Sequence, residues 1–431
     1  MIDKDKHIPQ GYKDSPLGII PKEWEVKRLG DIAEISSGTT PLRSNSRFYE
    51  KGVIPWVKTT DLNNGILYGT EEKVSQIAIE RTSLKVFPKD TILVAMYGGF
   101  NQIGRTALLG IEATINQALS ALICKEAVPS FVLAWLNCRV NDWKRYAASS
   151  RKDPNVTGTD VVKFPILIPP ISEQNIIVSA LSTWDSAIEK QSKLIEKLTL
   201  RKRALMQQLL TGKKRLPGFS GEWKEVKLGD IVTFQKNYAI SREQLNVNDG
   251  VVYNIHYGDV LIKYSYIINC EKEVLPFINR NVYNDSMTDF VENGDIIISD
   301  TAEDETVGKT CEVQNVGNRK ILAGLHTMLL RPNKGLFAPC FLGYYINSEA
   351  YHKKLLPLIQ GIKVCSIGKL AIQNTLIAIP DVDEQNAIAS VLVNADKEIG
   401  LTKEKLASLQ SQKRGLMQQL LTGKKRIKQG G

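Results

Sequence analysis

The chain has 431 residues, too many for a single hydrophobic core, so we expect two or three domains. Its formal net charge of +10 favours a polyanionic partner without identifying one. No apolar run reaches the roughly 18 residues of a membrane span, and the N-terminal residues lack the apolar core of a signal peptide. We therefore predict a cytoplasmic protein that does not contact membranes.

The first part of the chain is predicted to contain an N-terminal arm, residues 1–22, and a globular domain, residues 23–168. Short apolar runs bounded by Gly, Pro and Asn indicate strands, for example at 53–57, 91–95 and 118–123. The stretch 130–146 has helical periodicity. We expect an α+β domain of ordinary size.

A long helix is predicted within residues 169–215, and a second within residues 380–431, which also include a basic tail. Segments 173–215 and 384–426 align without a gap at an offset of 211, and residues 205–215 recur letter for letter at 416–426. Each helix of about 38 residues would be roughly 57 Å long. Apolar residues spaced by four and three predict a coiled-coil seam, which is most simply buried by pairing the two helices. The predicted seam residues are Ile177, Leu181, Trp184, Ile188, Leu198, Leu205 and Leu209, with Ile388, Leu392, Ile399, Leu406, Leu409, Leu416 and Leu420 in the second helix.

A second α+β domain is predicted at residues 216–379, because residues 222–231 repeat the motif of residues 23–32 at an offset of 199. The scaffold positions match, whereas loops such as 97–105 and 300–309 share little. This combination of a shared scaffold and different loops is expected of two domains that bind different surfaces. Neutral drift after an old duplication would produce the same pattern, and the sequence leaves both explanations open.

No catalytic or metal-binding residue is predicted. The six cysteines are scattered without C-x-x-C spacing and the four histidines do not cluster, so neither a zinc site nor a cofactor is expected. Gly308-Lys309-Thr310 lacks the first glycine of a phosphate-binding loop, because Glu303 stands there. Asp61, Glu71 and Lys73 loosely fit a nuclease metal site, which keeps an autonomous DNA-acting enzyme as an alternative.

Several loops have the composition of a DNA-binding surface. Residues 97–105 combine glycines, aromatic residues, amides and a cation, and amides and arginine can pair bidentately with adenine and guanine. A plain glycine-rich hairpin and solvated surface lysines are the alternatives. The candidate DNA-binding residues are Lys58, Thr59, Tyr97, Asn101, Gln102, Arg105, Arg151, Lys152 and Asn155 in the first domain, and Asn254, His256, Tyr257, Lys263, Lys309 and Lys363 in the second.

Three repeated motifs identify a resemblance that covers almost the whole chain. Each domain opens with E-W-x-x-x-x-L-G-D-I, each helix follows P-x-x-x-E-Q, and each helix ends in L-M-Q-Q-L-L-T-G-K-K-R. This combination resembles the specificity subunit of type I restriction-modification systems. The resemblance implies two similar α+β target recognition domains, separated by two long helices that pair as an antiparallel coiled coil with pseudo-twofold symmetry.

The resemblance also implies a function. A subunit of this family is a non-catalytic reader of a bipartite target in double-stranded DNA. Two modification subunits, which bind S-adenosylmethionine and methylate adenine, would dock on it, and restriction subunits with motor and nuclease activity are a further optional component. A coiled-coil adaptor that binds only proteins is the remaining alternative, against which the basic charge argues weakly.

Overall fold

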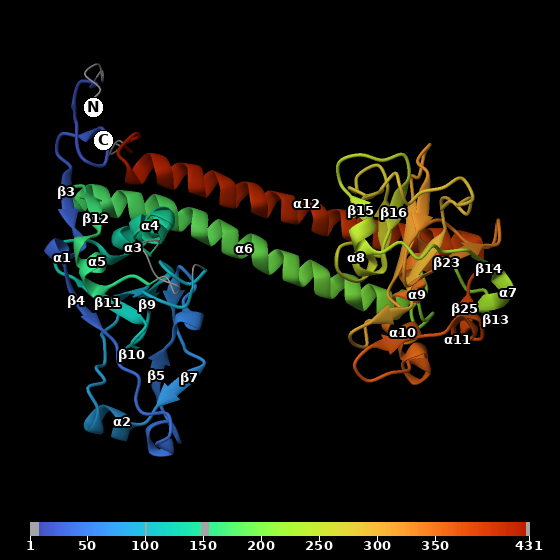
Figure 1. Ribbon diagram of the computed structural model, residues 1–431, viewed down its shortest axis with the longest axis horizontal. Coiled ribbons are helices and arrows are strands. Elements are labelled where there is room, and N and C mark those ends of the chain that lie inside the picture. Colours follow the sequence, from blue (N-terminus) through green and yellow to red (C-terminus); the bar gives the residue numbers. More distant parts are fainter. Residues whose placement is uncertain (1–7, 100, 148–154, 428–431) are drawn as a thin grey trace. The chain divides into compact units, whose positions relative to one another are not determined.

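The computed structural model describes residues 8–99, 101–147 and 155–427, and it divides into two compact units. Unit 1 contains residues 1–191 and 405–431, and unit 2 contains residues 192–404. The boundary therefore crosses both long helices, α6 (Ile171–Leu209) and α12 (Val382–Leu421) (Figure 1). Each unit combines one globular domain with a part of each helix. Within the described ranges, no helix is both long enough and apolar enough to cross a membrane.

The domain of unit 1 is built on a five-stranded sheet. Its order is β4 (Ala33–Ser37), β11 (Leu119–Cys124), β8 (Ile92–Ala95), β9 (Thr106–Leu109) and β6 (Ile66–Leu67). All neighbours are antiparallel except β6 and β9. Because successive side chains point to opposite faces, Ile92 and Val94 enter the core beneath α3 (Pro129–Cys138), whereas Leu93 and Ala95 enter a second core on the other face.

Smaller elements of unit 1 surround this sheet. A three-stranded sheet contains β10 (Thr114–Ile115), β5 (Ile54–Val57) and β7 (Glu72–Val74). Strand pairs join β3 (Glu25–Arg28) to β12 (Pro165–Ile168) and β1 (Tyr12–Lys13) to β2 (Ile20–Pro21). The short helices are α1 (Leu29–Ile32), η1 (Ser46–Phe48), η2 (Thr59–Asp61), α2 (Gln76–Arg81), α4 (Val140–Ala147) and α5 (Gly158–Lys163). The periodicity at 130–146 thus corresponds to two helices, α3 and α4, that meet at Arg139.

Unit 2 repeats this topology. Its five-stranded sheet has the order β14 (Val232–Gln235), β23 (Thr327–Pro332), β19 (Ile296–Ser299), β21 (Thr310–Gln314) and β17 (Ile267–Asn269), and again only the last pair is parallel. The four-stranded sheet contains β15 (Leu245–Asn246), β18 (Phe277–Ile278), β16 (Tyr253–Ile255) and β22 (Ile321–Ala323). The same strand order in both domains confirms the predicted duplication of an α+β scaffold.

Strand pairs and short helices complete unit 2. The pairs are β13 (Lys224–Lys227) with β25 (Leu376–Ile379), and β20 (Thr301–Ala302) with β24 (Cys365–Ser366). The helices are α7 (Leu228–Ile231), η3 (Arg242–Gln244), α8 (Tyr257–Ile262), α9 (Phe341–Ile346), α10 (Glu349–Leu355), η4 (Leu356–Leu358) and α11 (Lys369–Gln373).

The two long helices run antiparallel within each unit. In unit 1, Asp185 of α6 pairs with Lys413 of α12. In unit 2, Lys202 of α6 lies 2.6 Å from a carboxylate oxygen of Asp396 in α12. The predicted seam residues are all buried or half-buried, and these two pairs place lysines at polar positions of the seam. A lysine that pairs with a carboxylate at a polar seam position fixes the register of the two helices, at a cost in stability.

A second repeated contact ties each domain to the helix pair. In unit 1, Glu173 accepts hydrogen bonds from Trp24 Nε1 at 3.0 Å and from two guanidinium nitrogens of Arg426 at 2.9 Å. In unit 2, Glu384 does the same with Trp223 and Arg215. We call each group of three a latch. The latch explains why E-W, E-Q and the final arginine of L-L-T-G-K-K-R recur together.

The glutamine that follows each latch glutamate forms hydrogen bonds with backbone groups near helix starts. Gln174 accepts the backbone N–H of Val128, which precedes α3, and donates to the carbonyl of Pro169. Gln385 contacts Ala338 and Pro380 in the same way.

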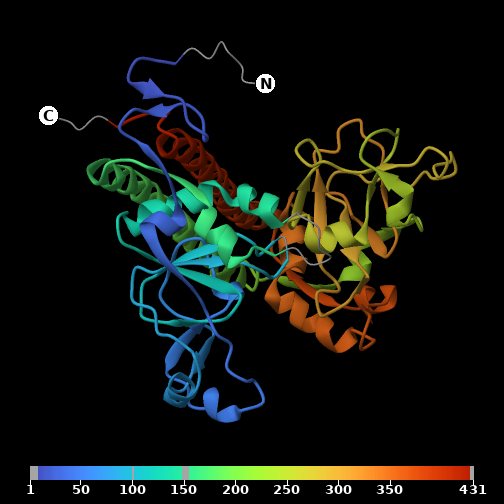
Figure 2. The ribbon, with the colours of Figure 1, turned by 60° about the vertical axis from the view of Figure 1, so that its left-hand side comes forward.

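In unit 1, Tyr12 of the predicted arm donates to the carbonyl of Gly423, so β1 and β2 lie beside the C-terminal end of α12 (Figure 2).

One core position differs in chemistry between the domains. Leu108 of β9 pairs with Ile92 of β8, and Glu312 of β21 pairs with Ile296 of β19 at the equivalent place. Glu312 is buried and accepts the backbone N–H groups of Cys340 and Gly343 at the start of α9. Burial raises the pKa of Glu312 to about 7, although these hydrogen bonds oppose the rise.

We predict that Glu173→Gln destabilises unit 1 by about 1–3 kcal/mol, because the amide cannot accept both guanidinium bonds from Arg426. Denaturant unfolding of the full chain measures this. Lys424→Gln alters an exposed neighbour of the latch and should change the free energy of unfolding by less than about 0.5 kcal/mol. Equal effects of the two substitutions would contradict a structural role for the latch.

We also predict a pH dependence that originates at Glu312. Its folded pKa of about 7 lies above the ordinary value of 4.5, so the stability that it contributes is complete below pH 4.5 and is lost as pH rises through 7. The loss amounts to at most about 3 kcal/mol. The difference in unfolding free energy between the wild type and Glu312→Gln should therefore shift in favour of the variant between pH 5 and pH 8. An unchanged difference would refute the assignment.

Candidate nucleic-acid interface

Three segments meet at one end of the five-stranded sheet in unit 1. They are the turn after β5 (58–62), the described parts of the loop between β8 and β9 (96–99 and 101–105), and the segment before α5 (155–157). A Cβ placed on Gly98 would lie 3.8 Å from Thr59 Oγ1, which puts the first two segments in contact. The backbone N–H of Val156 donates to the carbonyl of Met96 at 2.8 Å and joins the third segment.

The equivalent segments meet in unit 2. They are residues 257–263, 299–309 and 360–367. The backbone N–H of Ile367 donates to the carbonyl of Asp300 at 2.9 Å, and β20 pairs with β24. We call these three segments the loop edge of each domain. Most of the predicted DNA-binding residues lie on it, and their sequence separation shows that only the fold brings them together.

Two predicted DNA-binding cations hold the loop edge together. Arg105 donates to the carbonyl of Leu62 at 2.5 Å and to Gln102 at 3.0 Å. Lys309, at the equivalent place, donates to the carbonyl of Leu261 at 2.6 Å. Both side chains thus close the end of the preceding turn or helix. A DNA contact for them stays a prediction, and it would have to coexist with these internal bonds.

The remaining predicted residues of unit 1 differ in accessibility. Tyr97 is exposed, and its hydroxyl donates to the carbonyl of Gln117 at 3.0 Å. Asn101 is exposed, and Asn155 and Thr59 are half-buried. Arg151 and Lys152 lie outside the described residues.

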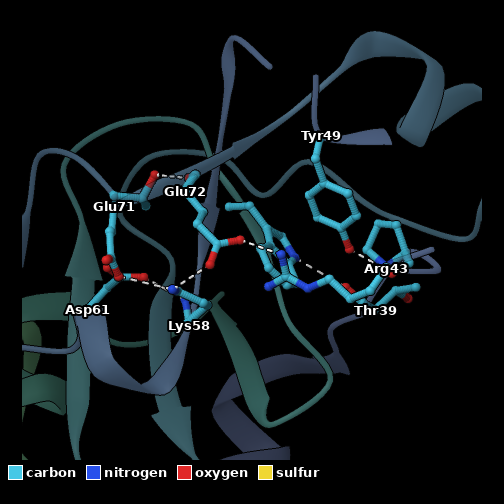
Figure 3. A network of polar contacts seen from close by, with 10 residues as sticks. Thr39, Arg43, Tyr49, Lys58, Asp61, Glu71 and Glu72 are labelled. Carbon is cyan, nitrogen blue, oxygen red and sulfur yellow. Dashed lines mark hydrogen bonds and ion pairs between the residues drawn. The ribbon is translucent and has the colours of Figure 1, made fainter. Parts of the chain in front are cut away.

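Lys58 belongs to a network of charged side chains (Figure 3). Its ammonium lies 2.7 Å from Glu72 and 3.0 Å from Glu71. Glu72 also accepts from Arg43, whose guanidinium lies 4.5 Å from the ring centre of Tyr49. These carboxylates raise the pKa of Lys58, and Arg43 with Lys58 lowers the pKa of Glu72. Lys58 is therefore a shielded cation, less available to a phosphate than the sequence suggested.

The residues that loosely fit a nuclease metal site, Asp61, Glu71 and Lys73, lie in the same region. Asp61 accepts the backbone N–H groups of Lys58 and Glu71 and so closes the turn that contains η2. Lys73 is exposed and lies in β7 opposite Pro55. Among the described residues, no group of three or more His, Cys, Asp or Glu side chains is placed to hold a metal ion. The described contacts of Asp61 and Lys73 are those of a closed turn and a strand pair.

Several predicted residues of unit 2 are engaged in the interior. Asn254 is fully buried in β16 and donates to the carbonyl of Leu322. His256 is 5% exposed and accepts the N–H of Gly258 at the start of α8. Burial, with help from Arg242, lowers the pKa of His256. The DNA-binding roles predicted for Asn254 and His256 remain untested, and we leave both out of the interface proposed below.

Other predicted residues of unit 2 reach the surface. Tyr257 is half-buried and its ring lies against those of His256 and His326. Lys263 is exposed, and its ammonium donates to the carbonyl of Val274 at 2.5 Å. Lys363 is exposed and forms no hydrogen bond or ion pair with any described residue.

His326 was not among the residues predicted from the sequence to bind DNA. Its carbonyl accepts the N–H of Asp300, as the carbonyl of Ala118 accepts that of Met96 in unit 1, so it occupies an equivalent place beside the loop edge. The side chain is half-exposed, with Nδ1 3.3 Å from Thr301 Oγ1 and 3.5 Å from Asp300. Its φ of +52° is left-handed, which is uncommon for residues other than glycine and clusters at functional sites.

The left-handed backbone at His326 predicts an inverted order of substitutions. His326→Gly should be more stable than His326→Ala by about 1 kcal/mol, because alanine is strained at positive φ. Thermal unfolding of both variants measures this. At Lys334, which is exposed and lacks a positive φ, alanine should be the more stable replacement. The same order at both positions would contradict strain at His326.

Comparison with known proteins agrees with the duplicated fold. The model of the type I restriction modification DNA specificity domain matches residues 21–200 and again residues 220–411. The MjaX specificity subunit of Methanocaldococcus jannaschii, described as a putative type I restriction enzyme, is 26% identical over 97% of both chains. The MjaIX specificity subunit of the same organism is 32% identical over 44% of this chain, and the match spans 45% of that relative.

Solved structures share the fold at low sequence identity. A chain from a study of complex assembly and conformational transition of the type I R-M system has a TM-score of 0.61 at 17% identity, over 94% of this chain and 99% of that one. The S subunit of a type I system from M. genitalium has a TM-score of 0.53 at 14% identity, over 92% and 96%. Since the family model matches most of the chain in two copies, the protein belongs to the type I restriction-modification DNA specificity family.

Proposed function

We propose that this chain is the specificity subunit of a type I restriction-modification complex and reads a bipartite target in double-stranded DNA. Each domain reads one half of the target through its loop edge. The observation that carries this proposal is a loop edge built twice on one scaffold, with different side chains at the two places. A shared scaffold with unlike loops suits two different half-sites better than one repeated ligand.

The chemistry of modification belongs to partner subunits in this proposal. Two modification subunits would bind S-adenosylmethionine and methylate adenine, which has to be rotated out of the duplex first. Restriction subunits would add cleavage. The chain itself would act without catalysis, in the cytoplasm, where it positions the other subunits on the DNA.

The proposal predicts two separate footprints that respond independently to substitution. The complex of this chain with its modification subunits should protect a split sequence, with an affinity that falls steeply as salt rises. Asn101→Ala in unit 1 should relax the sequence requirement in one half-site by about tenfold per contacted base and leave the other half unchanged. His326→Gly in unit 2 should affect only the opposite half. The measurement is competition binding against a set of single-base variants of the target.

Two results would contradict the proposal. Equal affinity for every duplex would favour a protein adaptor that does not read sequence. Substitutions on either loop edge that relax both half-sites equally would show that the domains do not read separate parts of the target.

A further inference from the structure

A hairpin on the loop edge of unit 2 presents an isoleucine to solvent. The side chain of Ile362 is 98% exposed, and that of Val364 is 57% exposed. Exposed aliphatic residues are common on protein surfaces. Here, however, two β-branched residues flank Lys363, and in the alignment at the offset of 211 their sequence counterparts in the first domain are Arg151 and Asp153. The tip of the second domain therefore carries apolar residues where the aligned sequence of the first domain has charged ones.

The hairpin holds this tip in a defined shape. Gln360 and Ser366 exchange two backbone hydrogen bonds of 2.9 and 2.8 Å, which close the loop. Gly361 has a φ of +101°, and a Cβ on it would lie 2.0 Å from the carbonyl oxygen of Val364. Only glycine fits this turn. The geometry that exposes Ile362 is thus built into the backbone.

The charge of the second domain indicates that it recognises DNA mainly through uncharged contacts. Residues 216–379 contain 16 basic and 18 acidic residues, a net charge of −2. The adjoining loop is acidic, with Glu303, Asp304 and Glu305 exposed. A domain with this balance gains little from general attraction to phosphates, so its sequence preference has to come from contacts to the bases themselves.

The surface of duplex DNA offers an aliphatic side chain one matching group. In the major groove, the C5-methyl of thymine is the apolar feature that distinguishes base edges, and aliphatic side chains pack against it. A lysine beside such a contact reaches the phosphate backbone and fixes the position of the hairpin. Ile362 and Lys363 have this combination of chemistries on adjacent residues.

We propose that Ile362 reads a thymine in the half-site of the second domain by packing on its methyl group, while Lys363 contacts a neighbouring phosphate. The inference rests on the proposed function and adds the base and the residues that read it. Val364 borders the contact and excludes water from it.

Adjacent substitutions separate the two contacts. Ile362→Ala should weaken target binding by the complex about tenfold, as expected for an aliphatic side chain that is buried on binding. The slope of log affinity against log salt should not change, because no charge is lost. Lys363→Ala should weaken binding and also reduce that slope by about one. Val247→Ala removes a side chain that is 70% exposed outside the loop edge and should have no effect.

A thymine-to-deoxyuridine scan of the target identifies the base. One replacement in the half-site of the second domain should weaken wild-type binding about tenfold and have little further effect on Ile362→Ala, because both changes remove the same contact. Additive effects at every thymine, or wild-type affinity of Ile362→Ala, would overturn the inference. Loss of modification-subunit binding by Ile362→Ala would assign the tip to a protein partner instead. If the wild-type complex shows no sequence preference, the proposed function itself fails.

Discussion

The structure depends on pairing between two polar positions of the helical seam and the carboxylates opposite them. Lys202 with Asp396, and Lys413 with Asp185, are the same contact at the offset of the repeat. Apolar stripes alone allow two helices to slide by whole heptads, whereas an ammonium inside the seam requires its carboxylate. The latches at Glu173 and Glu384 then fix each domain to the helices. A cation at a fixed position therefore determines both the register of the two helices and the attachment of each domain to them.

This arrangement separates what is constant from what varies. The seam, the latches and the glutamines that follow them recur in both halves of the chain, and so do the five-stranded sheets. The loop edges differ in charge and in polarity, as Ile362 shows, and His326 beside the second loop edge has a left-handed backbone. In the proposed function, a mutation in a loop edge would change a recognised base without disturbing the assembly. We propose that this independence is how such a subunit acquires new targets.

Local patterns in the sequence predicted the elements well, because they depend on neighbours a few residues apart. The heptads predicted α6 and α12, and the restarted motif predicted the second domain. Contacts between distant segments were beyond such patterns. Arg105 and Lys309, whose DNA contacts stay predictions, each close a turn or a helix end against the carbonyl of a residue more than 40 positions away. The net charge of +10 is also unevenly distributed, because residues 169–215 carry +5 and residues 380–431 carry +3, while the second domain is negative.

We propose one mechanical role for the paired helices, which is to set the distance between the two half-sites. Its most direct test lengthens both helices at matched positions, with seven residues inserted after Leu198 and seven after Ile399, so that the seam stays in register. The measurement is the spacer length of methylated sites in a host that expresses the variant. The account predicts unchanged half-sites and a spacer longer by at most about three base pairs. Altered half-sites with the original spacer would contradict it.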